Sequence, residues 1–256
     1  MNNLLAALMF FTRLPFHKIK QVPAESFSHV TGWWSVTGWL TGGIMALVFW
    51  LCSKIMIEQS ALVLALLSRI LLTGALHEDG LADFMDGFGG GNDRDSTLRI
   101  MKDSHIGTYG VLGLILYFLL SYTLLLNVQI QYMPVVLICG DVFCKCLSSH
   151  IVWFLPYARP ETESKNRTVY THPTVLEQTL TLVSGFGVLM LMPWAVRWIN
   201  TSFPLVFPLI HTTLPVAVFF LFIWLFKRRL NGYTGDCCGA LFLLTELAFR
   251  FMTAIF

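Results

Sequence analysis

Three aspartates in the sequence have a spacing suited to binding a cation. Asp79, Asp83 and Asp86 stand at positions i, i+4 and i+7, so on a helix they share one stripe. Like charges at this spacing repel one another, which favours a bound cation or a hydrated site. Carboxylate oxygens suit Mg²⁺, which fills its remaining positions with water and substrate phosphate. The stripe therefore predicts a magnesium-dependent phosphoryl site in which the three aspartates are catalytic metal ligands.

Glycines and cationic residues surround this stripe. Five glycines lie between positions 80 and 91, and glycine, a poor helix former, lets the backbone approach a ligand closely. Arg99 and Lys102 follow, and we expect them to bind phosphate oxygens. The alternative is an acidic, solvated helix end before a loop, which would leave the glycines and bases unexplained. Acids for a cation and bases for phosphates are together what diphosphate chemistry needs.

Other polar residues of the same segment have two readings each. His77 is a metal ligand or base, or else a hydrogen-bonded residue at the end of a span. Asp103 either completes the site or pairs with a neighbouring base in solvent. Asp93 and Asp95 lie in a run of turn-forming residues, and Ser96 is placed to cap the next helix. We expect these last three to be structural.

A second polar cluster precedes the last apolar run. Gly232, Thr234, Gly235 and Asp236 lie where the first turn of that helix would begin. Backbone N–H groups and the positive end of the helix dipole make such a position suitable for an anion. Capping by Thr234 or Asp236 is the alternative. We expect the cluster to bind substrate on the same side of the membrane as the aspartates.

The composition places these polar segments in a membrane protein. Of 256 residues, 55% are hydrophobic and 12% are charged, against roughly 25% charged residues in soluble domains. Apolar runs of about 18 residues or more can cross a membrane. The chain is predicted to be an all-α integral membrane protein, a single domain over 1–256 with a short N-terminal interfacial helix. About seven spans are expected, near 32–52, 59–76, 108–127, 133–155, 177–197, 205–226 and 237–256.

The basic residues indicate how these spans are oriented. Twelve of the seventeen lie in the segments 1–31, 77–107, 156–176 and 227–236, which would share one side. Because Lys and Arg collect in cytoplasmic loops, we expect the N-terminus and the polar clusters to face the cytoplasm, in a bacterial inner membrane. The bases are spread along one face and form no groove, so no nucleic acid is expected as a partner. Membrane lipid is expected, and homo-oligomerisation is left open.

Charged residues inside the expected spans occur in pairs. Asp141 and Lys145 are one helical turn apart, and Glu246 and Arg250 repeat that spacing, so each pair can neutralise itself. The six cysteines show no paired spacing and lie mostly in apolar runs, so they are assigned no metal or disulfide role.

Four segments resemble the adenosylcobinamide-GDP ribazoletransferase, or cobalamin synthase, family. They are FFTRLPF at 10–16, HEDGLADFMDGFGGG at 77–91, LRIMKDSHIGTYG at 98–110 and NGYTGDCCGA at 231–240. The resemblance extends over essentially the whole chain, in order. It implies an inner-membrane enzyme that requires Mg²⁺ and joins adenosylcobinamide-GDP to α-ribazole or α-ribazole 5′-phosphate, releasing GMP. Through these segments it also implies substrate-binding roles for Arg13, Arg99, Lys102, Asp103, Ser104, Gly107, Gly232, Thr234, Gly235 and Asp236, and a catalytic role for His77.

Other classes of membrane protein fit the sequence less well. A CDP-alcohol phosphotransferase is the nearest alternative, but the arginine expected after its first aspartate motif is missing after DGLAD. A transporter could use Arg69, Asp141, Lys145 and Glu246 as intramembrane charges, yet no repeated halves are visible. A purely structural subunit would leave the acidic segment without a purpose.

Overall fold

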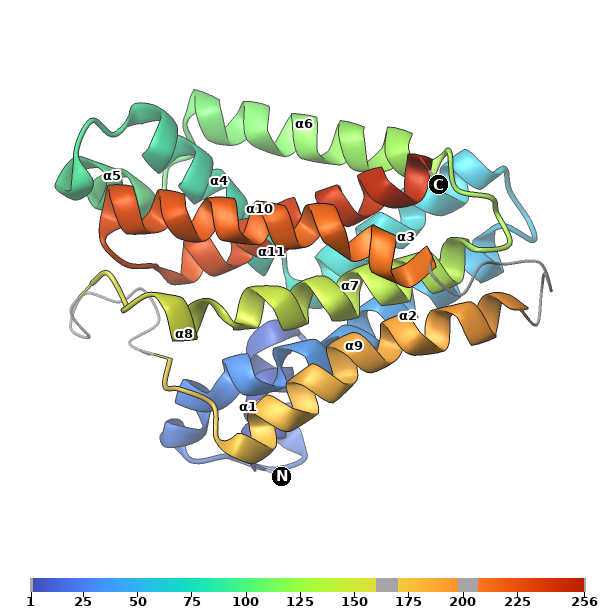
Figure 1. Cartoon of the computed structure of the whole chain (residues 1–256), viewed down its shortest axis with the longest axis horizontal. Coiled ribbons are helices and arrows are strands. Elements are labelled where there is room, and N and C mark those ends of the chain that lie inside the picture. The colour runs from blue at the N-terminus through green and yellow to red at the C-terminus, as the bar shows by residue number, and fades with distance from the viewer. Residues whose placement is uncertain (1, 160–169, 198–206, 256) are drawn as a thin grey trace.

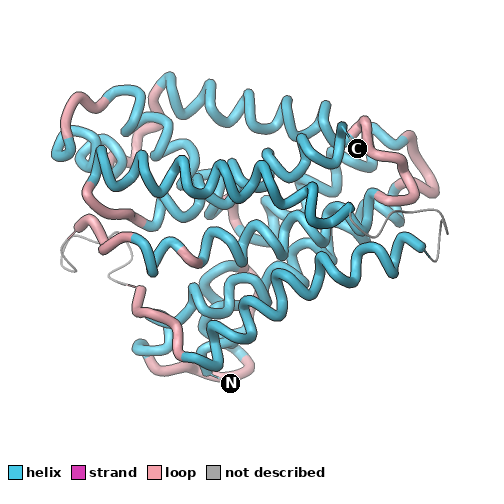
Figure 2. Tube along the Cα trace, viewed as in Figure 1, coloured by secondary structure: helices cyan, strands magenta, loops and turns pink. Residues whose placement is uncertain are grey.

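The computed structural model describes residues 2–159, 170–197 and 207–255, and every regular element in those ranges is a helix. The helices are joined by loops and turns (Figure 2). The elements, with η for 3₁₀ helices, are α1 Asn2–Phe11, η1 Phe16–Lys18, η2 Ala24–Trp33, α2 Trp34–Cys52, α3 Glu58–Thr73, α4 Leu76–Gly90, α5 Arg94–Lys102, α6 Thr108–Leu125, α7 Met133–Ser149, α8 Ile151–Phe154, α9 Val175–Arg197, α10 Phe207–Leu230 and α11 Gly235–Ile255. The predicted all-α membrane fold is confirmed.

Among the described residues, five helical stretches are long and apolar enough to cross a membrane. They are Ala24–Cys52, Thr108–Leu125, Met133–Phe154, Ile210–Leu230 and Gly235–Ile255, close to five of the expected spans. A sixth is possible only as a broken span, because α3 and α4 are bent by 90° relative to each other. Of α9, the part whose side chains are described, Val175–Leu191, is an apolar helix below that length. The predicted count of seven is therefore not confirmed.

The loops expected to share one side of the membrane lie together. In Figure 1 the turn between α4 and α5, the end of α8 and the turn between α10 and α11 gather at the left end of the bundle. The C-terminus and the loops after α2 and α6 lie at the right end. This division is the one that spanning helices produce, and it brings both polar segments to one end of the bundle.

Two glycines one turn apart allow α2 to pack closely against the central helix α7. A Cβ added at Gly38 would lie 2.8 Å from Val142 Cα, and one at Gly42 would lie 3.0 Å from Ile138 Cα. Small residues at this spacing let membrane helices approach through their backbones. Close packing of α2 and α7 therefore depends on having no side chain at these two positions.

The bend between α3 and α4 is made by two residues in left-handed conformation. Gly74 has φ +66°, which glycine adopts readily, but the next residue, Ala75, also has φ +59°. A left-handed conformation is unfavourable for alanine because its Cβ approaches the following carbonyl oxygen. The bend ends α3 and starts α4 with His77 in its first turn.

Six charged side chains meet in the interior of the bundle. Arg69 of α3 donates to both oxygens of Glu246 of α11 at 2.6 and 2.7 Å, and Arg250 lies 2.7 Å from the same carboxylate. Lys145 lies 2.8 Å from Asp141. Arg69 is also 3.6 Å from Glu78 and 4.0 Å from Asp141, so it joins the pairs. Three acids thus face three bases, and both predicted pairs, Asp141 with Lys145 and Glu246 with Arg250, are confirmed.

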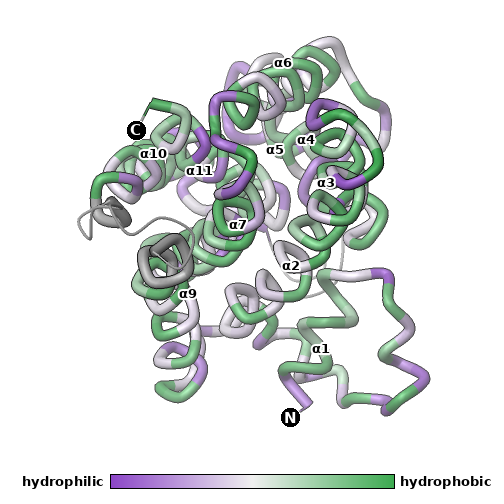
Figure 3. The backbone as a smooth tube through the Cα atoms, turned by 90° about the vertical axis from the view of Figure 1, so that its right-hand side faces the viewer, coloured by the Kyte–Doolittle hydropathy of each residue, from purple (hydrophilic) through white to green (hydrophobic). Residues whose placement is uncertain are grey.

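Large apolar side chains cover the outward faces of α6 and α10. On α6, Leu112, Ile115, Leu116 and Leu119 are each more than half exposed, as are Phe220, Leu221 and Trp224 on α10. In Figure 3 these two helices are largely hydrophobic along their length. Faces of this composition are typical of contact with lipid tails.

Candidate active site

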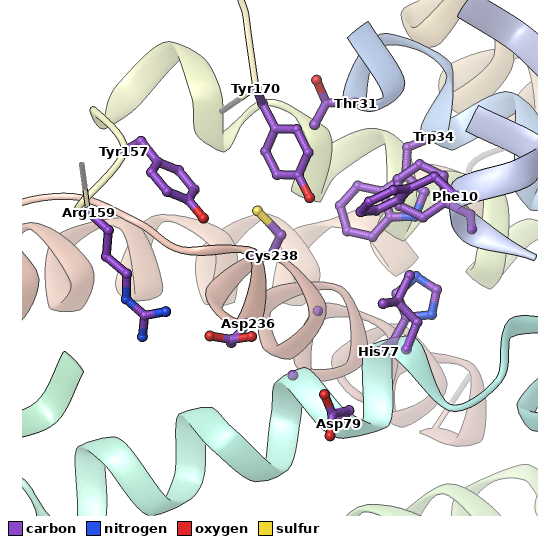
Figure 4. A pocket seen from close by; sticks show the side chains of 15 residues that line it. Phe10, Thr31, Trp34, His77, Asp79, Tyr157, Arg159, Tyr170, Asp236 and Cys238 are labelled. Carbon is purple, nitrogen blue, oxygen red and sulfur yellow. The ribbon is translucent and has the colours of Figure 1, made fainter. Parts of the chain in front are cut away.

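Two glycines bring the beginnings of α4 and α11 into backbone contact. A Cβ added at Gly80 would lie 3.1 Å from the carbonyl oxygen of Asp236 and 3.4 Å from Gly239 Cα. One added at Gly239 would lie 3.1 Å from the carbonyl oxygen of His77. Asp79 stands next to Gly80, and Asp236 stands three residues before Gly239. The two aspartates consequently line one cavity from neighbouring helices (Figure 4).

This cavity, called the acidic cavity below, has two carboxylates on one side and aromatic rings on the other. Besides Asp79 and Asp236 it is lined by Tyr157 and Tyr170, by Arg159, and by aromatic residues of α1 and α2 (Figure 4). Burial raises the pKa of Tyr170 well above its usual value, so its hydroxyl is protonated. The volume of about 120 Å³ is below the roughly 300–1,000 Å³ of drug-sized ligand sites. It can hold only part of a nucleotide-linked substrate.

His77 forms part of the inner wall of the acidic cavity. Its ring is nearly parallel to those of Trp34, 5.6 Å away, and Phe11, 6.1 Å away. The residue is only 1% exposed, and neither ring nitrogen has a hydrogen-bond partner within the described residues. Because buried polar atoms are normally paired, these nitrogens are available to a water molecule or to a bound substrate.

The three aspartates of the stripe have different surroundings. Asp79 is exposed, Asp83 is half-buried and Asp86 is buried. The carboxylate of Asp86 accepts hydrogen bonds from the backbone N–H groups of Gly107 at 2.7 Å and Gly110 at 2.8 Å. A Cβ at either glycine would collide with that carboxylate. Asp86 therefore holds the start of α6 in place. Gly107 has a structural role in this contact, in addition to the substrate-binding role predicted for it.

The donor set at the acidic cavity is compatible with Mg²⁺. Mg²⁺ is usually held by one or two carboxylates together with water and substrate phosphates, and Asp79 and Asp236 supply two. In the described part of the chain no group of three or more His, Cys, Asp or Glu side chains is arranged to hold a metal by itself. A substrate would thus have to complete the coordination. That Asp79, Asp83 and Asp86 share one metal stays a prediction.

A second cavity, the basic cavity, lies between α5 and the segment after α8. Within the described residues, its charged lining consists of Arg94, Arg99, Lys102, Arg159 and a single carboxylate, that of Asp95. Arg159 lines the acidic cavity as well, so the two cavities share this side chain. Four cations against one exposed carboxylate give an environment suited to an anion.

The cations of the basic cavity differ in how they are held. Arg94 donates to the carbonyl oxygens of Leu230 and Ala158 at 2.9 and 2.6 Å, and Arg159 donates to that of Leu98 at 2.9 Å. These two arginines fasten α5 to its surroundings. Arg99 and Lys102 are exposed and make no hydrogen bond or ion pair with any residue that the structure describes. They are the cations most available to a ligand.

The loop between α5 and α6 is organised by Asp103. Its carboxylate accepts from the backbone N–H of His105 at 3.0 Å and lies 2.7 Å from the His105 ring. These contacts lower the pKa of Asp103, the backbone hydrogen bond most strongly. Asp103 and the exposed Ser104 line neither cavity. Their predicted role in binding substrate stays a prediction.

Helix α5 has a different cap from the one expected. Asp93 is the N-cap residue and accepts from the backbone N–H of Ser96 at 2.8 Å, while the Ser96 hydroxyl accepts from the Asp93 backbone N–H. The backbone hydrogen bond from Ser96 lowers the pKa of Asp93. Ser96 is thus the third residue of the helix in a capping box, because its side chain reaches back to the N-cap.

The residues before α11 divide between packing and the acidic cavity. A Cβ at Gly232 would lie 2.6 Å from the carbonyl oxygen of Pro156, so this glycine lets the segment after α8 approach. The buried hydroxyl of Thr234 accepts from the backbone N–H of Cys237 at 3.3 Å and caps the helix. Gly235 and Asp236 line the cavity.

Arg13 lies apart from both cavities. Its backbone N–H donates to the carbonyl oxygen of Leu72 at 2.7 Å, and its side chain passes directly over Gly74. Its predicted role in substrate binding stays a prediction, whereas Phe10 and Phe11 of the same motif do line the acidic cavity.

Sequence reasoning assigned no site role to Arg159, Tyr157 or Tyr170. Arg159 appeared only as one of many bases on the cytoplasmic side, and the tyrosines lie in a connecting segment with no helical pattern. Tyr157 is brought to the cavity by backbone pairing: the Ala158 N–H donates to Tyr233 at 2.8 Å, and the Tyr233 N–H donates to Pro156 at 3.0 Å. Such pairing between distant segments leaves no periodic signal in a sequence.

The chain is similar to proteins of one named family. The cobalamin-5-phosphate synthase family matches residues 3–254. A protein named adenosylcobinamide-GDP ribazoletransferase from Shewanella baltica (strain OS185) is 34% identical over 255 residues, covering 98% of this chain and 93% of its own. One of the same name from Shewanella frigidimarina (strain NCIMB 400) is 33% identical over 261 residues, covering 96% and 92%. No solved structure matches the chain.

The fold and the site define a polytopic helical membrane enzyme. The family match extends over nearly the whole length, and both relatives exceed 30% identity over more than nine-tenths of the chain. The chain belongs to the cobalamin-5-phosphate synthase family.

Proposed function

We propose that the protein transfers the corrinoid-linked phosphoryl group of adenosylcobinamide-GDP to α-ribazole or α-ribazole 5′-phosphate and releases GMP. The product is adenosylcobalamin or its 5′-phosphate, formed at the end of cobalamin biosynthesis. Family membership supports the substrates, since the relatives carry the name adenosylcobinamide-GDP ribazoletransferase. The single structural observation that carries the proposal is the acidic cavity joined to the basic cavity through Arg159.

The reaction joins a ribose hydroxyl of the acceptor to the phosphorus that carries the corrinoid side chain. A new P–O bond forms, the P–O bond to GMP breaks, and the hydroxyl loses its proton. Asp79 and Asp236, or Asp79 with Asp83 and Asp86, would hold Mg²⁺, which supplies charge neutralisation at the diphosphate oxygens. Arg159 lies beside the carboxylates and can bind a diphosphate oxygen directly.

The remaining wall of the acidic cavity positions the acceptor. The unprotonated ring nitrogen of His77, which has no hydrogen-bond partner within the described residues, can accept a hydrogen bond from the attacking hydroxyl. Phe10, Tyr157 and Tyr170 offer aromatic surface for a heterocyclic base (Figure 4).

We place the site at the cytoplasmic face of a bacterial inner membrane. The positive-inside rule supports this orientation, because twelve of the seventeen basic residues lie in the segments 1–31, 77–107, 156–176 and 227–236, which would share one side. Lipid tails would contact the apolar faces of α6 and α10.

A turnover assay tests the proposed function. The protein, in membranes or detergent, is incubated with adenosylcobinamide-GDP and α-ribazole, with and without Mg²⁺. We expect a corrinoid product and GMP in equal amounts, and loss of both after the metal is chelated. A protein that instead accepts a CDP-alcohol, or that moves a solute without forming GMP, would contradict the proposal.

A further inference from the structure

Arg69 of α3 contacts four other helices from the interior of the bundle. Its Nη1 donates to both oxygens of Glu246 on α11 at 2.6 and 2.7 Å, and its Nη2 donates to the Tyr117 hydroxyl on α6 at 2.8 Å. Nη2 also lies 3.6 Å from Glu78 on α4, and Nη1 lies 4.0 Å from Asp141 on α7. Two of these helices, α4 and α11, carry the carboxylates of the acidic cavity. A side chain that joins the two helices can therefore set how those carboxylates are placed.

Glu78 connects Arg69 to the first turn of α4. It is 4% exposed, and neither of its carboxylate oxygens has a hydrogen-bond partner within the described residues. A buried carboxylate is costly unless a cation lies close, so the attraction of Arg69 keeps Glu78 turned into the bundle. Successive residues of a helix are about 100° apart, which leaves the next residue, the exposed Asp79, facing the acidic cavity. The pair consequently sets the rotation of α4 about its own axis.

The same pair spans the bend between α3 and α4. Arg69 and Glu78 stand on either side of Ala75, whose left-handed conformation is unfavourable for a residue with a Cβ. Such a conformation persists only where the surrounding structure enforces it. The attraction between the two charges across the bend is one such constraint, and its loss would let the start of α4 move.

We infer that Arg69 is a positioning residue for the phosphoryl transfer. Through Glu78 and Glu246 it holds the start of α4 against α11. This arrangement keeps Asp79 and Asp236 on one cavity. The inference rests on the proposed function. Arginine suits the role because its planar fork can contact two carboxylates at once, whereas lysine presents a single compact ammonium group.

Steady-state kinetics of two variants test the inference. Arg69→Lys keeps the charge but cannot hold both carboxylates, and Glu78→Gln removes the partner on α4 without breaking a hydrogen bond within the described residues. We expect kcat, measured by GMP release, to fall at least tenfold in each variant, because the carboxylates of the cavity are displaced. The KM for adenosylcobinamide-GDP should stay within about twofold, because neither side chain contacts the substrate. Glu78→Gln carries the test if Arg69→Lys does not fold.

Arg250→Lys is the matched control. Arg250 is 2% exposed, lies 2.7 Å from the same Glu246 carboxylate and donates to Ser121 on α6 at 2.7 Å. None of its hydrogen bonds or ion pairs within the described residues reaches α4. This variant should lower the thermal midpoint much as Arg69→Lys does, while its kcat stays within about twofold of the wild-type value.

Amide hydrogen exchange reports on α4 without any turnover. In Arg69→Lys and Glu78→Gln the amides of residues 76–82 should exchange roughly threefold faster or more, whereas in Arg250→Lys they should match the wild type. An equal loss of kcat in Arg250→Lys, or a loss without faster exchange in this segment, would show that Arg69 only supports the fold. Full kcat in Glu78→Gln, or a change confined to the KM for adenosylcobinamide-GDP, would also overturn the inference. Absence of turnover in the wild-type protein would instead overturn the proposed function, and the exchange comparison would still decide whether Arg69 positions α4.

Discussion

Gly80 and Gly239 face each other across the contact of α4 and α11 with no side chain between them: a Cβ on Gly80 would lie 3.4 Å from Gly239 Cα. The contact sets the separation of Asp79 and Asp236, which stand next to Gly80 and near Gly239 on the two helices. Any atom inserted here must push backbone against backbone, because no flexible side chain can move away.

Replacing Gly239 by alanine should therefore impair catalysis. The new Cβ would meet the His77 carbonyl oxygen at 3.1 Å and His77 Cα at 3.3 Å, so the helices must separate by a few tenths of an ångström. Overpacking of this kind destabilises by roughly 1–3 kcal/mol. We expect kcat to fall at least tenfold, measured by GMP release, with a lower thermal midpoint in detergent. Gly43→Ala is the control, since a Cβ there meets nothing within 4 Å; equal effects of the two changes would contradict this account.

The aspartate stripe predicts a metal-dependent loss of activity. Asp79→Asn, Asp83→Asn and Asp86→Asn each remove a charge at constant size, so Mg²⁺ should bind more weakly. Activity should fall at least a hundredfold, which is about 2.7 kcal/mol of transition-state stabilisation. Excess Mg²⁺ or Mn²⁺ should restore part of it, as measured by titrating the metal.

Variants of the α5 cap provide the comparison for the stripe. Asp93→Asn keeps an acceptor for the Ser96 N–H, and Asp95 is 91% exposed, so Asp93→Asn and Asp95→Asn should be nearly silent. If the stripe variants keep full turnover at limiting Mg²⁺, or if the two α5 variants are equally inactive, the metal assignment is wrong. Asp86→Asn has a second expected effect, since it weakens the hydrogen bonds that hold the start of α6.

The buried pair on α7 should show strong coupling. Lys145 and Asp141 are both 0% exposed and 2.8 Å apart, so Lys145→Met leaves a buried carboxylate without its nearest cation, with only the Thr41 hydroxyl and the more distant Arg69, 4.0 Å away, as polar partners. Breaking such a pair typically costs about 3–5 kcal/mol, whereas replacing both partners by apolar residues costs much less. We expect Lys145→Met to lower the yield of folded protein more than Lys145→Met with Asp141→Leu does. Simply additive effects on thermal stability would show that the two charges are independent.

The orientation of the bundle can be tested with reporter fusions. The turn between α10 and α11 and the loop after α6 lie at opposite ends of the bundle (Figure 1). A reporter after Leu230 should be cytoplasmic, and one after Asn127 should be periplasmic, because the basic residues are concentrated at the first end. The reverse pattern would place the site outside the cell and exclude the proposed location.

Local spacing in the sequence predicted the features that lie within one helix. Of the seven spans expected from the apolar runs, five are found, and the spacing of four residues predicted the pairs of Asp141 with Lys145 and Glu246 with Arg250. The bend at Ala75 could not be predicted, because alanine has no preference for a positive φ and only the packed structure enforces it.

Features that join distant segments were not predictable from one sequence. Arg69 and Glu246 are separated by 177 residues, and no periodicity relates them. The same holds for Arg159, whose position follows from its hydrogen bond to Leu98 and from the pairing of the neighbouring Ala158 with Tyr233. Asp79, Arg99 and Lys102, which the sequence predicts as site residues of one segment, line two different cavities, and this division needed the structure.

The buried charges also constrain how the protein is made. A ribosome delivers α3 to the membrane long before α11, so Arg69 enters the bilayer while Glu246, its partner at 2.6 Å, has not yet been synthesised. Until then Arg69 has only the more distant carboxylates of Glu78 at 3.6 Å and, once α7 is made, Asp141 at 4.0 Å. An arginine that lacks a close partner at the middle of a span is unfavourable by roughly 2.5–3.5 kcal/mol on insertion scales. Insertion of α3 therefore has to be provisional, with the helix at the membrane surface, at the translocon or beside water until the last helix arrives. If the helices insert in the order of their synthesis, the early helices stay incompletely assembled until α11 is made. Insertion of α11 then completes the assembly.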